Sequence, residues 1–184
     1  YTLPWIEDKY GFDFTPYTDL ILVIMVLLVP ICFGALIGFS ILEDRDDNVL
    51  INVKVTPLSI HQFLGFRLVA IYILCVLATA FVMWFSKIGN LAIKHIIAIS
   101  LLASLEAPIS GLLINYFAGN KIEGFAVMKV GGSIIIFPIV ALFLNGAKEL
   151  LFSFAPGFWT AKAISSLIRG TELYLSYNQY FYIG

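Results

Sequence analysis

The chain has 184 residues, of which 60% are hydrophobic and 12% are charged, and its formal net charge is −1. A soluble domain carries roughly 25% charged residues, so this composition excludes an ordinary soluble protein. The near-zero net charge gives no reason to expect binding to nucleic acid. Several apolar runs reach the roughly 20 residues that a helix needs to cross a bilayer, and the alternating segments of a barrel are absent from the sequence. The chain is therefore predicted to be an all-α integral membrane protein with about four transmembrane helices.

Residues 1–18 mix aromatic, acidic, proline and glycine residues. This mixture suits a belt at the membrane interface, and a frayed end of the chain is the alternative. The first membrane span is predicted at about residues 20–42, with Pro30 in its middle as the expected position of a kink. Gly34 and Gly38 follow at a spacing that permits close packing against another helix, within the chain or in a second subunit.

The segment at residues 43–59 is charged and lies between the first two apolar runs. Three of its apolar residues fall near one face of a helix: Val49, Leu50 and Val53. Most of its polar residues fall on the other face. Thr56 and Pro57 end the pattern, because proline disfavours helix in the residue before it. The segment is interpreted as a short amphipathic helix held at the membrane surface, and an ordinary polar loop is the alternative.

The second span is predicted at about residues 60–85. Arg67 lies in its second turn, and its long side chain can reach back toward the surface occupied by residues 43–59. His61 lies in the first turn. No His, Cys or acidic residue lies at ligand spacing from it in the sequence, so it is interpreted as an interfacial polar residue rather than a metal ligand.

The third span is predicted at about residues 91–117 and contains Glu106 near its middle. A carboxylate at this depth costs several kcal/mol unless it is protonated, paired or hydrated. Two interpretations remain open. Glu106 is either a functional residue on a substrate path or a neutral carboxyl that packs against a neighbouring helix.

The remaining sequence predicts a loop, a fourth span and a long interfacial region. Residues 118–129 form a polar loop, and a short fourth span with Pro138 is predicted at about residues 126–147. Residues 148–184 are aromatic and semi-polar, with a break at Pro156 and the glycine that follows it. They are interpreted as interfacial or partly re-entrant segments of a single transmembrane domain that covers residues 1–184.

The orientation of this domain does not follow from its charges. Because successive spans alternate in direction, residues 43–59 and 118–129 are expected on one side of the membrane and residues 148–184 on the other. Lys and Arg residues are divided almost evenly between the two sides. The positive-inside rule therefore does not identify the cytoplasmic side.

The sequence contains no P-loop, G-x-S-x-G, H-E-x-x-H or C-x-x-C pattern. Asp44, Asp46 and Asp47 lack the frame of a calcium-binding loop and are interpreted as a solvated acidic face. Cys32 and Cys75 lie in apolar runs and suggest no disulfide framework. The chain is therefore expected to be a non-enzymatic subunit without a metal or cofactor of its own.

Six stretches spread along the chain carry a common pattern: Tyr10–Tyr17, Pro30–Leu42, Leu42–Ser59, Glu106–Pro108, Ala118–Lys129 and Ala155–Ala163. Together they resemble the membrane-spanning subunit of an ABC-type exporter with six helices per subunit. More narrowly, the chain is similar to small bacterial permeases described as fluoroquinolone exporters. The resemblance implies that the chain lacks the first and last helices of such a permease and is part of a longer protein.

The resemblance also implies an orientation and partners. Residues 43–59 would be the cytoplasmic coupling loop, whose short coupling helix docks on an ABC ATPase subunit that binds ATP-Mg. The implied docking residues are Glu43, Asp44, Arg45, Asp47, Val49, Leu50, Val53, Thr56 and Pro57. Residues 118–129 would be the second cytoplasmic loop, and residues 148–184 an external re-entrant segment. A second permease subunit, in a homodimer, would complete the complex in the cytoplasmic membrane of a bacterium.

The leading functional hypothesis is therefore the membrane subunit of an ATP-driven exporter of a small, amphipathic, drug-like molecule. Two alternatives remain. One is a gradient-driven secondary transporter with Glu106 as its coupling carboxylate, although the sequence lacks the internal repeat that many such proteins have. The other is a membrane scaffold or immunity protein that transports nothing.

Overall fold

The computed structural model describes residues 18–47, 59–144, 146–169 and 175–183. The regular elements in these residues are all helical, which confirms the predicted all-α class. In chain order they are α2 (Thr18–Asp46), α4 (Ile60–Ser86), η2 (Ile88–Asn90), α5 (Ile93–Ser104), α6 (Glu106–Phe117), α7 (Lys121–Ser133), α8 (Ile136–Leu142), η3 (Gly146–Phe152), α9 (Phe158–Arg169) and α10 (Tyr177–Ile183).

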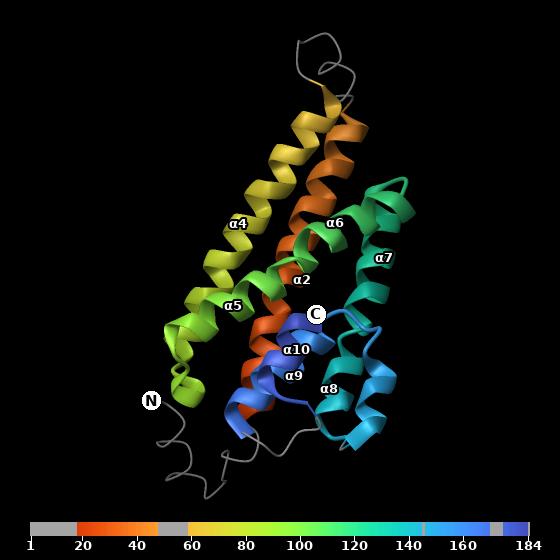
Figure 1. The fold of residues 1–184 in the computed structure, drawn as a ribbon. Helices are drawn as coiled ribbons and strands as arrows, with labels where there is room; N and C mark the ends of the chain where they lie inside the picture. The colour runs from red at the N-terminus through yellow and green to blue at the C-terminus, as the bar shows by residue number, and fades with distance from the viewer. Residues whose placement is uncertain (1–17, 48–58, 145, 170–174, 184) are drawn as a thin grey trace, which may run out of the picture.

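Four stretches of this described part are long and apolar enough to cross a membrane: α2, α4, α5 with α6, and α7 with α8. The helix α4 runs beside α2 (Figure 1). Many of its large apolar side chains are exposed. Phe66, for example, is 76% exposed. Such a surface is unfavourable in water and suits contact with lipid. The number of spans agrees with the prediction from the sequence.

Two of the four spans are interrupted, and each interruption lies about one helical turn before a proline. Pro108 cannot donate a backbone hydrogen bond to Ser104, and α5 ends at Ser104. Likewise, Pro138 cannot donate to Ile134, which separates α7 from α8. The backbone at Leu105 instead bonds three residues back, to Leu102, at 3.3 Å. In contrast, Pro30 lies inside a helix that continues from Thr18 to Asp46.

Two element boundaries differ from the predicted ones. The helix α2 continues to Asp46, so the first charged residues of the predicted 43–59 loop are helical. The helix α7 begins at Lys121, although residues 118–129 were expected to form a loop. Asn120 caps α7 by accepting a hydrogen bond from the Glu123 backbone N–H at 2.9 Å, which explains the early start.

Glycines allow α2 and α6 to cross closely. A Cβ atom placed on Gly34 would lie 2.7 Å from Ser110 Cβ, and one placed on Gly111 would lie 2.4 Å from Ile37 Cγ2. Both distances are too short for ordinary packing. The spacing of Gly34 and Gly38 therefore serves a helix contact within this chain.

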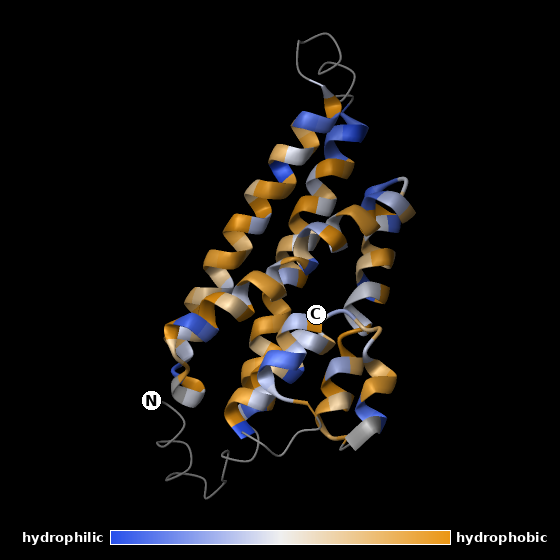
Figure 2. Ribbon diagram, in the orientation of Figure 1, coloured by the Kyte–Doolittle hydropathy of each residue, from blue (hydrophilic) through white to orange (hydrophobic). Residues whose placement is uncertain are grey.

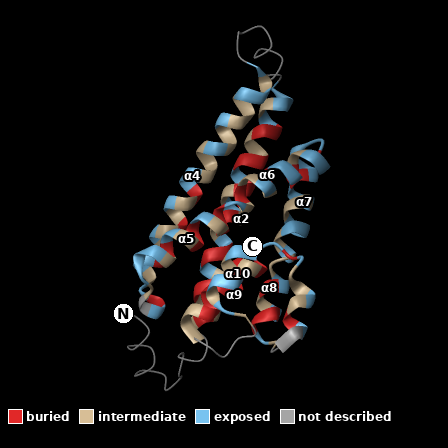
Figure 3. Cartoon of the chain, viewed as in Figure 1, coloured by how far each residue is buried: buried red, intermediate tan, exposed pale blue. Residues whose placement is uncertain are grey.

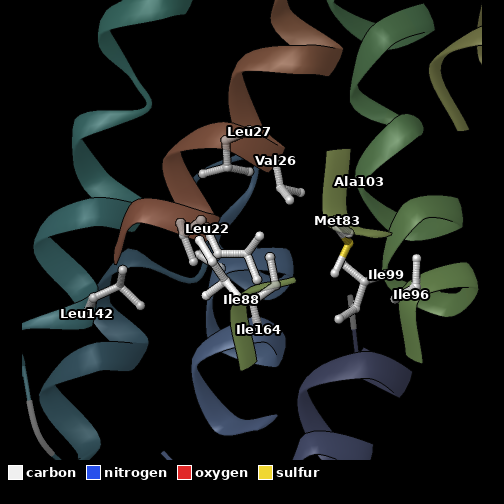
Figure 4. Close-up of a cluster of buried hydrophobic side chains, with 12 residues drawn as sticks. Leu22, Val26, Leu27, Met83, Ile88, Ile96, Ile99, Ala103, Leu142 and Ile164 are labelled. Atoms are coloured by element: carbon white, nitrogen blue, oxygen red, sulfur yellow. The ribbon is translucent and has the colours of Figure 1, made fainter. Parts of the chain in front are cut away.

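A hydrophobic cluster joins α2 to the helices around it (Figure 4). Its members include Leu22 and Val26 from α2, Met83 from α4, Ile99 from α5, Leu142 from α8 and Ile164 from α9. Burial is concentrated on α2 and α9, whereas α4 and α7 have few buried residues (Figure 3). The helix α2 is thus the central element of the bundle.

The segment before α9 reaches the middle of the bundle. Gly157 lies against Leu27 of α2 and Glu106 of α6, while Arg169 at the other end of α9 pairs with Asp19. Asp19 and Leu27 are about 12 Å apart along the α2 axis, from the helical rise per residue. Residues 157–169 therefore run along the first part of α2, the path that a re-entrant segment would take.

Substitution of Gly34 by leucine should lower the free energy of unfolding by about 1–3 kcal/mol, because the new side chain would meet the α6 backbone at Ala107 as well as Ser110. The measurement is SDS-induced unfolding in mixed micelles. Gly65→Leu on α4 is the matched control, since a Cβ at Gly65 meets no atom within 4 Å. Equal stability of the two variants would contradict the close crossing.

Candidate functional site

Hydrophilic residues gather where α2 ends and α4 begins (Figure 2). We call this the loop end and define it by residues 43–47 and 118–121, which approach each other through an ion pair between Glu43 and Lys121. The opposite end, which contains η2, Asp19 and Arg169, is called the distal end. Residues 47 and 59 flank the part of the predicted coupling loop that lies outside the described residues.

Asp44 and Arg67 tie α2 to α4 at the loop end. Their side chains form an ion pair and are only 18% and 27% exposed, respectively. Arg67 also donates a hydrogen bond to Ser40 Oγ at 2.8 Å, and its guanidinium lies 5.2 Å from the centre of the Phe63 ring. Arg67 therefore reaches the region that the sequence predicted, but its partners belong to α2 and to its own helix.

The neighbouring residues tie α2 to α6 and α7. The Glu43 carboxylate lies 2.8 Å from Lys121 Nζ, and both side chains are largely exposed. Arg45 donates hydrogen bonds to the backbone oxygens of Asn115 and Ala118, at 3.1 and 3.3 Å. A cation at these last carbonyls of α6 is also favoured by the helix dipole.

Three of the four charged residues that were expected to dock on a partner therefore make contacts within this chain. Glu43, Asp44 and Arg45 make intramolecular contacts with three different helices. Asp47 is exposed at the end of α2. The remaining predicted docking residues, Val49, Leu50, Val53, Thr56 and Pro57, lie outside the described residues.

Between α2, α6, α7 and the turn at Pro156 lies a partly open cavity of about 470 Å³. Its lining consists of Ile31, Ala35, Ser110, Leu113, Ile114, Phe117, Ala126, Val127, Met128, Val130, Gly131, Gly132, Ile134 and Pro156. Ser110 is the one lining residue with a polar side chain. The volume lies within the range of about 300–1,000 Å³ that is typical of small-molecule sites.

Glu106 lies in the first turn of α6 and is partly buried. A Cβ atom placed on Gly157 would lie 3.2 Å from Glu106 Oε1 and 2.7 Å from Leu27 Cδ2. Gly157 also has φ = +78°, a conformation that favours glycine. The carboxylate therefore lies beside the turn that contributes Pro156 to the cavity.

Comparison with known proteins decides the family. A sequence profile described as "Fluoroquinolones export permease protein Rv2686c-like" matches residues 1–184. The chain belongs to this family.

The curated relatives include two proteins of Mycobacterium tuberculosis. They are the fluoroquinolones export permease protein Rv2686c of strain ATCC 25618 / H37Rv and its counterpart MT2760 of strain CDC 1551 / Oshkosh. Each is 34% identical to this chain over 161 residues, which cover 86% of this chain and 64% of the relative. No solved structure matches the chain. Together with its four apolar helices, these relatives identify a Rv2686c-like multi-pass protein of the bacterial cytoplasmic membrane.

The distal half of this Rv2686c-like chain holds a buried ion pair that the sequence analysis missed. Lys162 Nζ lies 2.7 Å from Glu149 Oε2, and both side chains are fully buried. Tyr180 of α10 donates a further hydrogen bond to Glu149. Burial, together with this hydrogen bond, raises the pKa of Tyr180 above its ordinary value, so its hydroxyl remains a donor.

Asp19 forms a second polar cluster at the distal end. Its carboxylate lies 2.7 Å from Arg169 Nε and accepts a hydrogen bond from Ser165 Oγ at 2.9 Å. A signal for these clusters exists in the sequence, because Lys162, Ser165 and Arg169 fall at helical spacing within a partly apolar segment. The partners Asp19 and Glu149 lie on other elements and could not be assigned from that spacing.

A double-mutant cycle of Asp44→Asn and Arg67→Gln should give a coupling energy of about 0.5–3 kcal/mol, because this pair is largely shielded from solvent. The measurement is SDS-induced unfolding of the two single variants and the double variant. The matched control is the cycle of Glu43→Gln and Lys121→Gln, an exposed pair for which a smaller coupling is expected. A larger coupling in the control cycle would contradict this assignment.

Substitution of Lys162 by methionine should destabilise the protein by about 3–5 kcal/mol, because Glu149 would remain buried without its cation. The double variant Lys162→Met/Glu149→Leu should recover most of that loss. Unfolding free energies of the two variants check this expectation. A double variant no more stable than the single one would show that the cost arises from packing rather than from the unpaired carboxylate.

Proposed function

We propose that this chain is the membrane-spanning part of an ATP-driven ABC exporter that moves a small amphipathic, drug-like molecule out of the cell. The observation that carries the proposal is its membership of the Rv2686c-like family over residues 1–184. The names of the 34% identical relatives supply the direction of transport and the substrate class, fluoroquinolones. The chain spans 64% of the length of those relatives.

In this proposal the energy source is a separate ABC ATPase subunit that binds and hydrolyses ATP-Mg in the cytoplasm. It docks on residues 43–59, with Val49, Leu50 and Val53 as the apolar contact residues. Glu43, Asp44, Arg45 and Asp47 set the position of this loop by their charges, and Thr56 and Pro57 end the docking helix. A second copy of the permease completes the transport path.

The contacts at the loop end support a mechanism for the coupling. Residues 48–58 connect α2 to α4, and the pair of Asp44 and Arg67 holds these two helices together. Arg45 and Glu43 extend the connection to α6 and α7. A push on the loop would therefore move several helices as one body, the kind of rigid rotation that switches a two-state transporter.

Substitution of Leu50 by aspartate should reduce ATP-dependent transport at least tenfold, because a charge on the apolar face prevents docking. The experiment uses the full-length permease co-expressed with its ATPase and measures uptake of norfloxacin, a fluorescent fluoroquinolone, into inside-out vesicles. Asn52→Asp is the matched control on the polar face and should leave transport within twofold. The amount of permease in the membrane should be equal in both variants.

Transport by Leu50→Asp at the rate of the unsubstituted protein would contradict the docking proposal. A co-purifying protein with a Walker motif is expected from the unsubstituted permease and should be lost with Leu50→Asp. Transport abolished by a protonophore but independent of ATP would instead favour the gradient-driven alternative.

A further inference from the structure

Residues from α2, α6 and the turn before α9 line the cavity together with α7. They include Ile31 of α2, Ser110 of α6 and Pro156. Leu27 precedes Ile31 by four residues, and Glu106 precedes Ser110 by four residues, which is about one helical turn in each case. Gly157 directly follows Pro156 and contacts both Leu27 and Glu106. Glu106 is not itself a lining residue, but it lies about one helical turn from Ser110 and beside the turn that contributes Pro156 to the cavity.

Glu106 differs from the other acidic side chains that lie inside the bundle. Asp19 is paired with Arg169, Asp44 with Arg67, and Glu149 with Lys162. Across residues 18–47, 59–144, 146–169 and 175–183, the structure shows no basic residue or hydrogen-bond donor in contact with the Glu106 carboxylate.

A carboxylate in apolar surroundings gains most from a positively charged partner. The cavity beside it offers almost no polar group, so its occupant must be apolar over most of its surface. Met128 and Phe117 add a flexible and an aromatic surface, which suit ligands of varied shape. The Glu106 carboxylate and the apolar cavity lining together favour a ligand with an apolar body and one cationic end.

We propose that the cavity and Glu106 form one binding site for an amphipathic cation, with the apolar body in the cavity and a protonated amine at the Glu106 carboxylate. The proposal deepens the proposed function, because such a ligand would be the transported molecule. Binding requires only this permease, whereas export also requires the ATPase. A binding experiment without the ATPase therefore tests the site separately from the export proposal.

The test measures binding of two fluorescent probes to the full-length permease in phosphatidylcholine nanodiscs. Dansylcadaverine carries a primary ammonium, and its N-acetyl derivative has the same apolar body without the charge. The unsubstituted protein should bind dansylcadaverine about tenfold more tightly, a ratio typical of one hydrogen bond to a charged group. Glu106→Gln should make the two affinities equal, whereas Glu106→Asp should retain a preference for the cation.

A second variant locates the probes in the cavity. Gly131 lines the cavity, and a Cβ atom placed on it meets no atom within 4 Å. Gly131→Leu should therefore fold and fill part of the cavity, and it should weaken binding of both probes at least fivefold. Gly65→Leu on α4 is the matched control, because Gly65 is equally open but does not line the cavity.

Three results would overturn the proposal. Equal affinities of the unsubstituted protein for the two probes would remove the cation preference and leave the cavity to neutral ligands or lipid chains. A preference unchanged in Glu106→Gln would remove the carboxylate from the site, and binding unchanged in Gly131→Leu would place the probes elsewhere. The first and third results do not depend on the Glu106→Gln variant, so they decide the question even if that variant fails to fold.

Discussion

The close crossing of α2 and α6 determines the positions of most other groups in this bundle. Because Gly34 and Gly111 lack side chains, the two helices approach until backbone touches side chain. Asn115 then reaches the Gly38 carbonyl at 3.0 Å, and Arg45 reaches the last carbonyls of α6. The same approach places Ser110 at the cavity wall and Glu106 one turn away. A wider crossing would break the contacts of Asn115 and Arg45 and would change the cavity wall at Ser110.

The helix α2 carries paired charges near both of its ends. Asp19 binds α9 through Arg169 and Ser165 at the distal end, and Asp44 binds α4 through Arg67 at the loop end. Between these ends its packing is apolar. Apolar packing resists separation of the helices but sets their rotation and register less strictly than directional ion pairs do. The charges therefore specify how α2 is oriented relative to its neighbours.

Much of this architecture follows from local sequence signals, and the remainder depends on contacts between distant residues. Apolar length predicts four spans, and the spacing of Gly34 and Gly38 predicts a close crossing. The sequence shows Pro108 and Pro138, but it does not show whether each proline interrupts its helix. Pro30, for example, lies within a continuous helix. Glu149 pairs with Lys162 and Tyr180, which come from different elements, so no periodicity could connect them.

The interruption before α6 does little to stabilise a charge on Glu106. Leu105 keeps a helical conformation, so the last carbonyls of α5 lie at the start of α6 and the helix dipole offers the Glu106 carboxylate little stabilisation. Placing a charge in the membrane interior costs about 2.5–3.5 kcal/mol for an aspartate on insertion scales. A proton or a cation must therefore offset this cost. A site that can exchange one for the other could bind an amine when the ligand is present and remain neutral when it is absent.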